Sequence, residues 1–178
     1  MAKKHLLSER DFWAVIAKFN WKKTGDDDAV MAPAVKLLAS KSEAAIKSFA
    51  DLLAEKLRAL DTREHARHSS DDFDPDDAEQ YLSPDDFLYA RCCVVANGAR
   101  FYGAVLKDPK KMPKDMEFES ILFLPEQAWE AKTGGSFDYT SPIDFETFAN
   151  EQGWKPTAKT KRGKATGSVV PRRNRRPA

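Results

Sequence analysis

Apolar residues recur at intervals of three and four over the first sixty positions, and this is the spacing of amphipathic helices. Ser8 is a suitable N-cap, and the apolar stripe that follows it comprises Phe12, Val15, Ile16 and Phe19. A second helix is expected over residues 29–40, with Pro33 in its first turn or delaying its start. The strongest pattern begins after Ser42 and predicts a helix of about five turns, whose apolar face consists of Ala45, Ile46, Phe49, Leu52, Leu53, Leu57 and Leu60.

A long apolar segment follows in the second half of the chain. Ser83 and Pro84 are typical of a helix start, and we expect one continuous, buried helix that ends before Pro109. Gly98 lies inside this segment and weakens a helix there, which suggests the close approach of another helix.

Two shorter helices complete the prediction. One starts at Pro125, after a short segment from Phe118, and ends at the glycines that follow Thr133. The other covers residues 144–153. No stretch of useful length alternates apolar and polar residues, so we predict an all-α fold, a compact multi-helix bundle.

Charge divides the chain into two unlike parts. The formal net charge is only +1, yet residues 155–178 hold nine basic and no acidic residues, which leaves 20 basic against 28 acidic residues in 1–154. After Trp154, apolar residues become too sparse to offset the entropy of ordering the chain. We therefore predict a helical domain over residues 1–154 and a disordered basic tail over residues 155–178.

The cysteines and the N-terminus bear on the compartment. Cys92 and Cys93 are the only cysteines, and neighbouring residues rarely form a disulfide, which favours a reducing compartment. The first apolar run stops after Leu6 and Leu7, and no stretch approaches the ~20 apolar residues that span a bilayer. We expect a cytoplasmic protein that does not enter a membrane.

The segment from Ser83 to Gly134 resembles the centre of a known family. The resemblance is carried by Asp86-Phe87-Leu88-Tyr89-Ala90-Arg91, Val94-Val95, Gly98, Tyr102, Val105-Leu106-Lys107-Asp108-Pro109, Glu119-Ser120-Ile121-Leu122-Phe123 and Ala128-Trp129-Glu130-Ala131-Lys132-Thr133-Gly134. These residues are similar to the bacterial domain of unknown function 4240 family. The resemblance implies an intracellular, helical bacterial domain, and it implies no activity.

Alternating acids in a polar loop superficially look like a calcium site. Asp72, Asp74 and Asp76 have that spacing, but Asp77 and Ser83 stand where a calcium loop needs Gly and Glu. We therefore predict a solvated acidic loop.

Histidines and cysteines supply the other candidate ligands. His65 and His68 would share one face of a helix, yet two ligands are too few for a zinc site. Cys92 and Cys93 have only Arg91 beside them to stabilise a thiolate, so we expect buried, unreactive thiols. We predict no metal site and no cofactor.

Arg91 stands in an otherwise apolar segment. A buried arginine is costly unless its guanidinium meets a carboxylate or backbone acceptors. Two interpretations are open: Arg91 binds an acidic ligand, or it pairs inside the protein with an acid such as Glu119, which is the commoner arrangement.

The basic tail is the clearest functional feature. Clusters of Lys and Arg bind phosphates with salt-dependent affinity, but they also bind acidic proteins or the acidic body of the same chain. The candidate residues are Lys159, Lys161, Arg162, Lys164, Arg172, Arg173, Arg175 and Arg176.

No nucleophile–base pair, metal set or phosphate-binding loop is visible in the sequence, so we do not expect an enzyme. We expect an interaction or regulatory module whose folded body binds a protein partner, with electrostatic assistance from the tail. The alternative is a nucleic-acid-associated regulatory protein that binds DNA or RNA through the tail.

Overall fold

The computed structural model describes residues 6–156 of the chain. These residues form helices and connecting segments, and no strand occurs among them. The α-helices are α1 (Glu9–Ile16), α2 (Asp27–Ala39), α3 (Glu43–Leu60), α4 (Arg63–Arg67), α5 (Pro84–Ala96), α6 (Ala99–Lys107) and α7 (Leu124–Thr133). The short 3-10 helices are η1 (Trp21–Lys23), η2 (Pro109–Lys111) and η3 (Glu119–Phe123). The predicted all-α class is confirmed. Residues 157–178 of the predicted disordered tail lie outside the described part, so the disorder stays a prediction.

Short polar side chains start five of the α-helices by accepting a hydrogen bond from a free N–H of the first turn. The capping residues are Ser8, Asp26, Ser42, Thr62 and Ser83.

The second helix differs from its prediction. α2 begins at Asp27 and continues past Pro33. Pro33 therefore lies inside the helix, beyond its first turn, and does not delay its start. Proline removes one helical hydrogen bond. Four buried residues of α2 pack into the core and offset that loss, namely Val30, Met31, Ala34 and Leu38.

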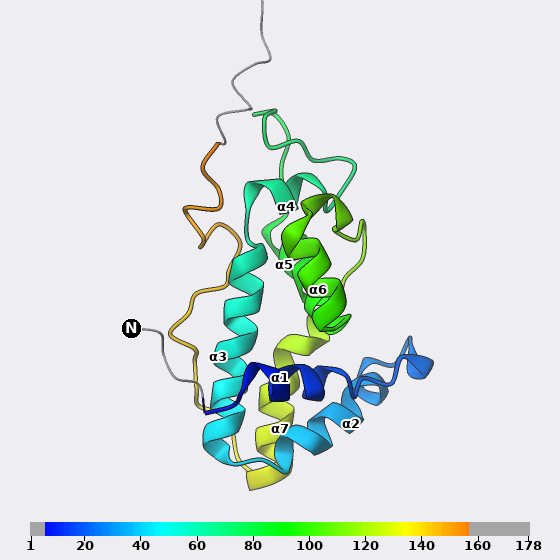
Figure 1. The fold of residues 1–178 in the computed structure, drawn as a ribbon, viewed down its shortest axis with the longest axis vertical. Helices are drawn as coiled ribbons and strands as arrows, with labels where there is room; N and C mark the ends of the chain where they lie inside the picture. The colour runs from blue at the N-terminus through cyan, green and yellow to red at the C-terminus, as the bar shows by residue number, and fades with distance from the viewer. Residues whose placement is uncertain (1–5, 157–178) are drawn as a thin grey trace, which may run out of the picture.

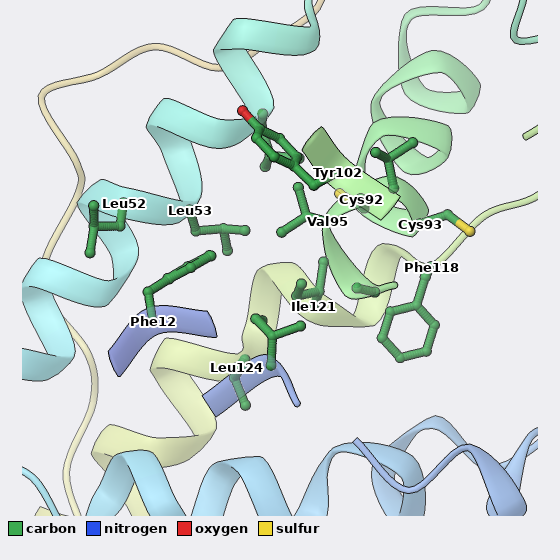
Figure 2. Close-up of a cluster of buried hydrophobic side chains, with 14 of the residues drawn as sticks. Phe12, Leu52, Leu53, Cys92, Cys93, Val95, Tyr102, Phe118, Ile121 and Leu124 are labelled. Atoms are coloured by element: carbon green, nitrogen blue, oxygen red, sulfur yellow. The ribbon is translucent and has the colours of Figure 1, made fainter. Parts of the chain in front are cut away.

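The core lies where α3, α5 and α7 meet, with α1 crossing over them (Figure 1). α2 packs along α7, and together they close one end of the molecule. Figure 2 shows side chains of this core, among them Phe12, Leu53, Val95, Tyr102 and Leu124, which come from α1, α3, α5, α6 and α7.

The expected continuous helix before Pro109 is wrong, because two helices replace it. α5 ends at Ala96, and α6 begins after Gly98. Gly98 has φ +87°, a left-handed conformation that suits glycine and breaks the helix. A Cβ built on Gly98 would meet nothing within 4 Å, so the close helix approach inferred from this glycine is also wrong.

The helix expected after Pro125 is confirmed, since α7 spans Leu124–Thr133 and ends at Gly134 in the left-handed conformation. The last short helix, over 144–153, does not form. We call residues 135–156 the C-terminal strap. It runs beside α3 from the end near α7 to the end near α4 (Figure 1). Along this path Tyr139 donates to Asp51 at 2.8 Å, and Arg58 donates to the carbonyl of Asp144 at 2.6 Å.

Within residues 6–156, no helix has both the length and the apolar character that crossing a bilayer requires.

Candidate functional site

The eight basic candidates of the tail lie outside the described residues. Their proposed binding role therefore stays a prediction. They are Lys159, Lys161, Arg162, Lys164, Arg172, Arg173, Arg175 and Arg176.

Arg91 lies within the described residues, and its guanidinium donates hydrogen bonds to other groups of the protein. The side chain is fully buried on α5. It donates to the carbonyls of Leu57 at 3.0 Å and Phe145 at 2.9 Å, and to the hydroxyl of Thr147 at 2.8 Å. Within the described residues these acceptors take the place of the carboxylate of Glu119, so that expected pairing is wrong. Burial lowers the pKa of Arg91, and the charge of Asp61 opposes this effect.

The thiols have the burial that the sequence predicted. Cys92 and Cys93 both lie in the core. Burial raises the pKa of each thiol, which disfavours the reactive thiolate.

The histidines were weighed as metal ligands, and the structure gives one of them an internal role. His65 is buried, with Nδ1 2.7 Å from the Thr62 hydroxyl and Nε2 3.2 Å from the carbonyl of Val105. No group of three or more His, Cys, Asp or Glu that could hold a metal ion is found in the part of the chain that the structure describes.

The acidic loop between α4 and α5 is exposed to solvent, as predicted, and arginines of α4 hold part of it. Arg67 contacts Asp74 at 2.5 Å and Asp76 at 2.6 Å, and Arg63 contacts Asp76 at 2.6 Å. The hydrogen bonds from Arg63 and Arg67 lower the pKa of Asp76. The loop therefore folds back on α4 and leaves one side of the α5 start open.

That open side is a hollow of about 540 Å³, which we call the acidic hollow. Three segments form it: the start of the loop, the end of the loop together with the first two turns of α5, and the segment before η3. Its lining residues are Ser69, Ser70, Asp72, Phe73, Tyr81, Leu82, Ser83, Asp86, Phe87, Ala90, Asp115, Met116 and Glu117. Leu82, Phe87 and Ala90 are buried and form an apolar floor, whereas the side chains of Tyr81 and Met116 are 80% and 55% exposed.

Four carboxylates of the hollow have no cationic partner among residues 6–156: those of Asp72, Asp86, Asp115 and Glu117. All four residues are exposed. The contrast with the adjoining loop is direct, since Asp74 and Asp76 are paired with arginines there. Charges of one sign that surround a concave surface attract ligands of the opposite sign.

A second hollow, of about 370 Å³, adjoins the first and shares Phe73, Tyr81 and Leu82 with it. The far wall of this second hollow includes Phe148 and Trp154 of the C-terminal strap. The two hollows therefore lie next to each other, between the end of the strap and the segment before η3. The strap therefore brings the start of the basic tail to the edge of the acidic hollow.

Two serine hydroxyls at the hollow are hydrogen-bonded within the protein. The hydroxyl of Ser69 donates to the carbonyl of Ala66, and that of Ser83 caps α5. No histidine or cysteine is among the described residues that line the hollow. The apolar floor with an anionic rim fits a ligand that has both aliphatic and cationic groups.

Sequence reasoning missed this site. Its walls come from separate segments between residues 69 and 117, and no spacing rule joins Asp72 to Asp115. The one available signal was Tyr81, a large aromatic residue that follows the polar, acid-rich stretch and lies in no predicted helix.

The comparisons with known proteins give one result. No curated protein and no solved structure matches the chain. The family model described as "Protein of unknown function (DUF4240)" matches residues 7–131, which include the core helices, the loop and most of α7. The C-terminal strap lies beyond the match. The chain therefore belongs to the DUF4240 family.

Proposed function

We propose that this protein is a cytoplasmic, non-enzymatic interaction module whose folded body binds an arginine-containing segment of a protein partner in the acidic hollow. One observation carries the proposal: four exposed carboxylates without a cationic partner in the described residues surround an apolar floor. The buried, unbridged thiols of Cys92 and Cys93 support a reducing compartment.

Arginine fits this hollow better than lysine does. A guanidinium binds a carboxylate through two parallel hydrogen bonds and stacks on aromatic faces such as that of Tyr81. Exposed ion pairs contribute only about 0.2–1 kcal/mol each. Apolar contacts must therefore supply much of the affinity. Because the floor residues are already buried, these contacts come mainly from the exposed side chains of Tyr81 and Met116, and the partner segment needs aliphatic residues beside its arginines.

A fluorescein-labelled peptide with four arginines and three aliphatic residues tests this function by fluorescence anisotropy with the full chain. Replacing the four carboxylates with amides (Asp72→Asn, Asp86→Asn, Asp115→Asn, Glu117→Gln) should weaken binding by at least about tenfold. The same peptide with citrulline in place of arginine should not bind.

A matched control changes the net charge by the same amount at the other end of the molecule. It carries Glu43→Gln, Glu126→Gln, Glu130→Gln and Asp138→Asn, all at exposed positions. This variant should bind the peptide like the unmodified chain. Equal loss in both variants would show that only overall charge matters, and would overturn the proposal.

The basic tail favours a second candidate function, binding of DNA or RNA. Nine basic and no acidic residues in 155–178 would give affinity for phosphates that falls steeply with salt. Gel-shift titration of generic duplex DNA at two salt concentrations tests it. Replacing Arg172, Arg173, Arg175 and Arg176 with glutamine should weaken binding and make it less dependent on salt, because four of the nine basic residues lose their charge. Unchanged binding would contradict this candidate.

A further inference from the structure

We propose that residues 169–176 of this chain occupy the acidic hollow of the same molecule and compete there with the partner segment. The proposal rests on the hollow being the binding site proposed above. It adds the identity of one occupant and a means of regulation.

The first argument is where the strap ends. The carboxylate of Asp61 holds the strap by accepting from the indole N–H of Trp154 at 2.8 Å and from the backbone N–H of Asn150 at 2.8 Å. The ring of Trp154 lies edge-on to Phe87, with 6.0 Å between the ring centroids. Phe87 belongs to the floor of the hollow. The chain therefore leaves the described part, at Pro156, beside the wall of the site.

The second argument is reach. Twelve residues, 157–168, separate Pro156 from Val169. A chain of that length spans up to roughly 45 Å when extended, so residues 169–176 reach any point of a hollow that adjoins Trp154.

The third argument is chemical complementarity. Val169-Val170-Pro171 is an apolar triplet, and four arginines follow it: Arg172, Arg173, Arg175 and Arg176. The hollow offers an apolar floor and four carboxylates without cationic partners in the described residues. The charges are equal in number and opposite in sign. The other basic cluster, Lys159–Lys164, has no such apolar triplet beside it.

Residues 169–176 are covalently connected to the hollow that they would occupy, and this connection favours them over the same segment of a second copy of the chain. A short flexible connection gives an effective concentration of about a millimolar. Weak contacts, such as exposed ion pairs over a small apolar surface, are then sufficient for docking within one molecule. Docking between two molecules would need a protein concentration of the same order.

Backbone amide spectra of the full, isotopically labelled chain test the docking. Two variants carry the same change of charge: Arg172, Arg173, Arg175 and Arg176 to Gln, and Lys159, Lys161, Arg162 and Lys164 to Gln. The amide signals of Tyr81, Asp86 and Glu117 should shift in the arginine variant and stay near their unmodified positions in the lysine variant. High salt should move the unmodified chain toward the arginine variant, because salt screens exposed charges.

Three outcomes would overturn the docking. The first is that the amide signals of the hollow residues are identical in the unmodified chain and the arginine variant. The second is that these signals shift equally in both variants. The third is that they change with protein concentration, which would indicate a second copy of the chain.

A peptide with the sequence of residues 169–176 separates this inference from the proposed function. The arginine variant should bind it on the order of tenfold more tightly than the unmodified chain, because its own competitor is gone. Equal binding by both at the hollow would refute the docking and keep the hollow as a binding site. No binding by either would refute both.

Discussion

The carboxylate of Asp61 accepts a hydrogen bond from the indole N–H of Trp154, and the two groups are 2.8 Å apart across 93 residues of chain. The same carboxylate accepts from the backbone N–H groups of Phe148 at 3.1 Å and Asn150 at 2.8 Å. Asp61 is fully buried. One side chain at the end of α3 therefore determines the path of the last part of the strap, and with it the place where the tail begins.

Replacing Asp61 with asparagine should destabilise the fold by about 2–4 kcal/mol, because hydrogen bonds to a charged acceptor contribute more than those to a neutral one. Asparagine also removes the negative charge near the buried guanidinium of Arg91. Urea denaturation monitored by tryptophan fluorescence measures the change. Trp154→Phe is the matched comparison and should cost less, since it removes one of the three bonds. An Asp61→Asn variant as stable as the unmodified chain would contradict this role.

Arg91 fastens the same strap from α5. Lysine at this position keeps the charge but cannot reach two carbonyls and a hydroxyl at once. Arg91→Lys should therefore cost about 2–4 kcal/mol of unfolding free energy, as expected when a buried charge loses its partners. Arg100→Lys, at an exposed position of α6, is the control and should be near neutral. Similar losses in the two variants would show that the bonds of Arg91 contribute little.

Arg91 also shows what the sequence could reveal and what it could not. Its burial followed from its apolar neighbours, but the internal partner expected for it was an acid such as Glu119. Its actual acceptors, the carbonyls of Leu57 and Phe145, carry no sequence signal, because every residue has a carbonyl.

The helix predicted over 144–153 does not form, because backbone groups of this segment make long-range hydrogen bonds. Its apolar spacing was typical of a helix, yet the backbone groups that would bond within it bond to Arg91 and Asp61 instead. Phe148 then adopts a positive φ of 76°. Long-range hydrogen bonds overrode a local preference, whereas the helix starts at Ser8, Ser42 and Ser83 depended on neighbouring residues alone and were predicted correctly.

Substitutions at two glycines test whether the break between α5 and α6 depends on the conformation of Gly98. Gly98→Ala should destabilise the protein by about 1 kcal/mol, because a side chain at φ +87° is strained. Gly103→Ala should stabilise it by about 0.5–1 kcal/mol, since Gly103 is exposed inside α6 and a Cβ there meets nothing within 4 Å. Thermal denaturation of both variants gives the sign. Equal effects of the two substitutions would mean that the conformation of Gly98 is not required.

His65 should make stability depend on pH. Burial lowers the pKa of its imidazole, and the positive charges of His68 and Arg91 act in the same direction, while the bond to Val105 and the charge of Glu64 oppose them. The unfolded chain then binds the proton more readily than the folded one. Stability is therefore complete above the unfolded value of about 6.5 and is lost as the pH falls below it, by at most about 1.4 kcal/mol per pH unit.

The comparison of the unmodified chain with His65→Gln isolates this titration. At pH 8 the difference in unfolding free energy between the two measures the lost packing and the lost bonds to Thr62 and Val105. Between pH 8 and pH 5 that difference should shrink, because only the unmodified chain must keep a buried imidazole neutral against a growing tendency to bind a proton. Urea denaturation at four pH values follows the change. A difference that stays constant or widens toward acid pH would show that the folded protein accommodates the charged imidazole, and the buried contacts of His65 would then need another explanation.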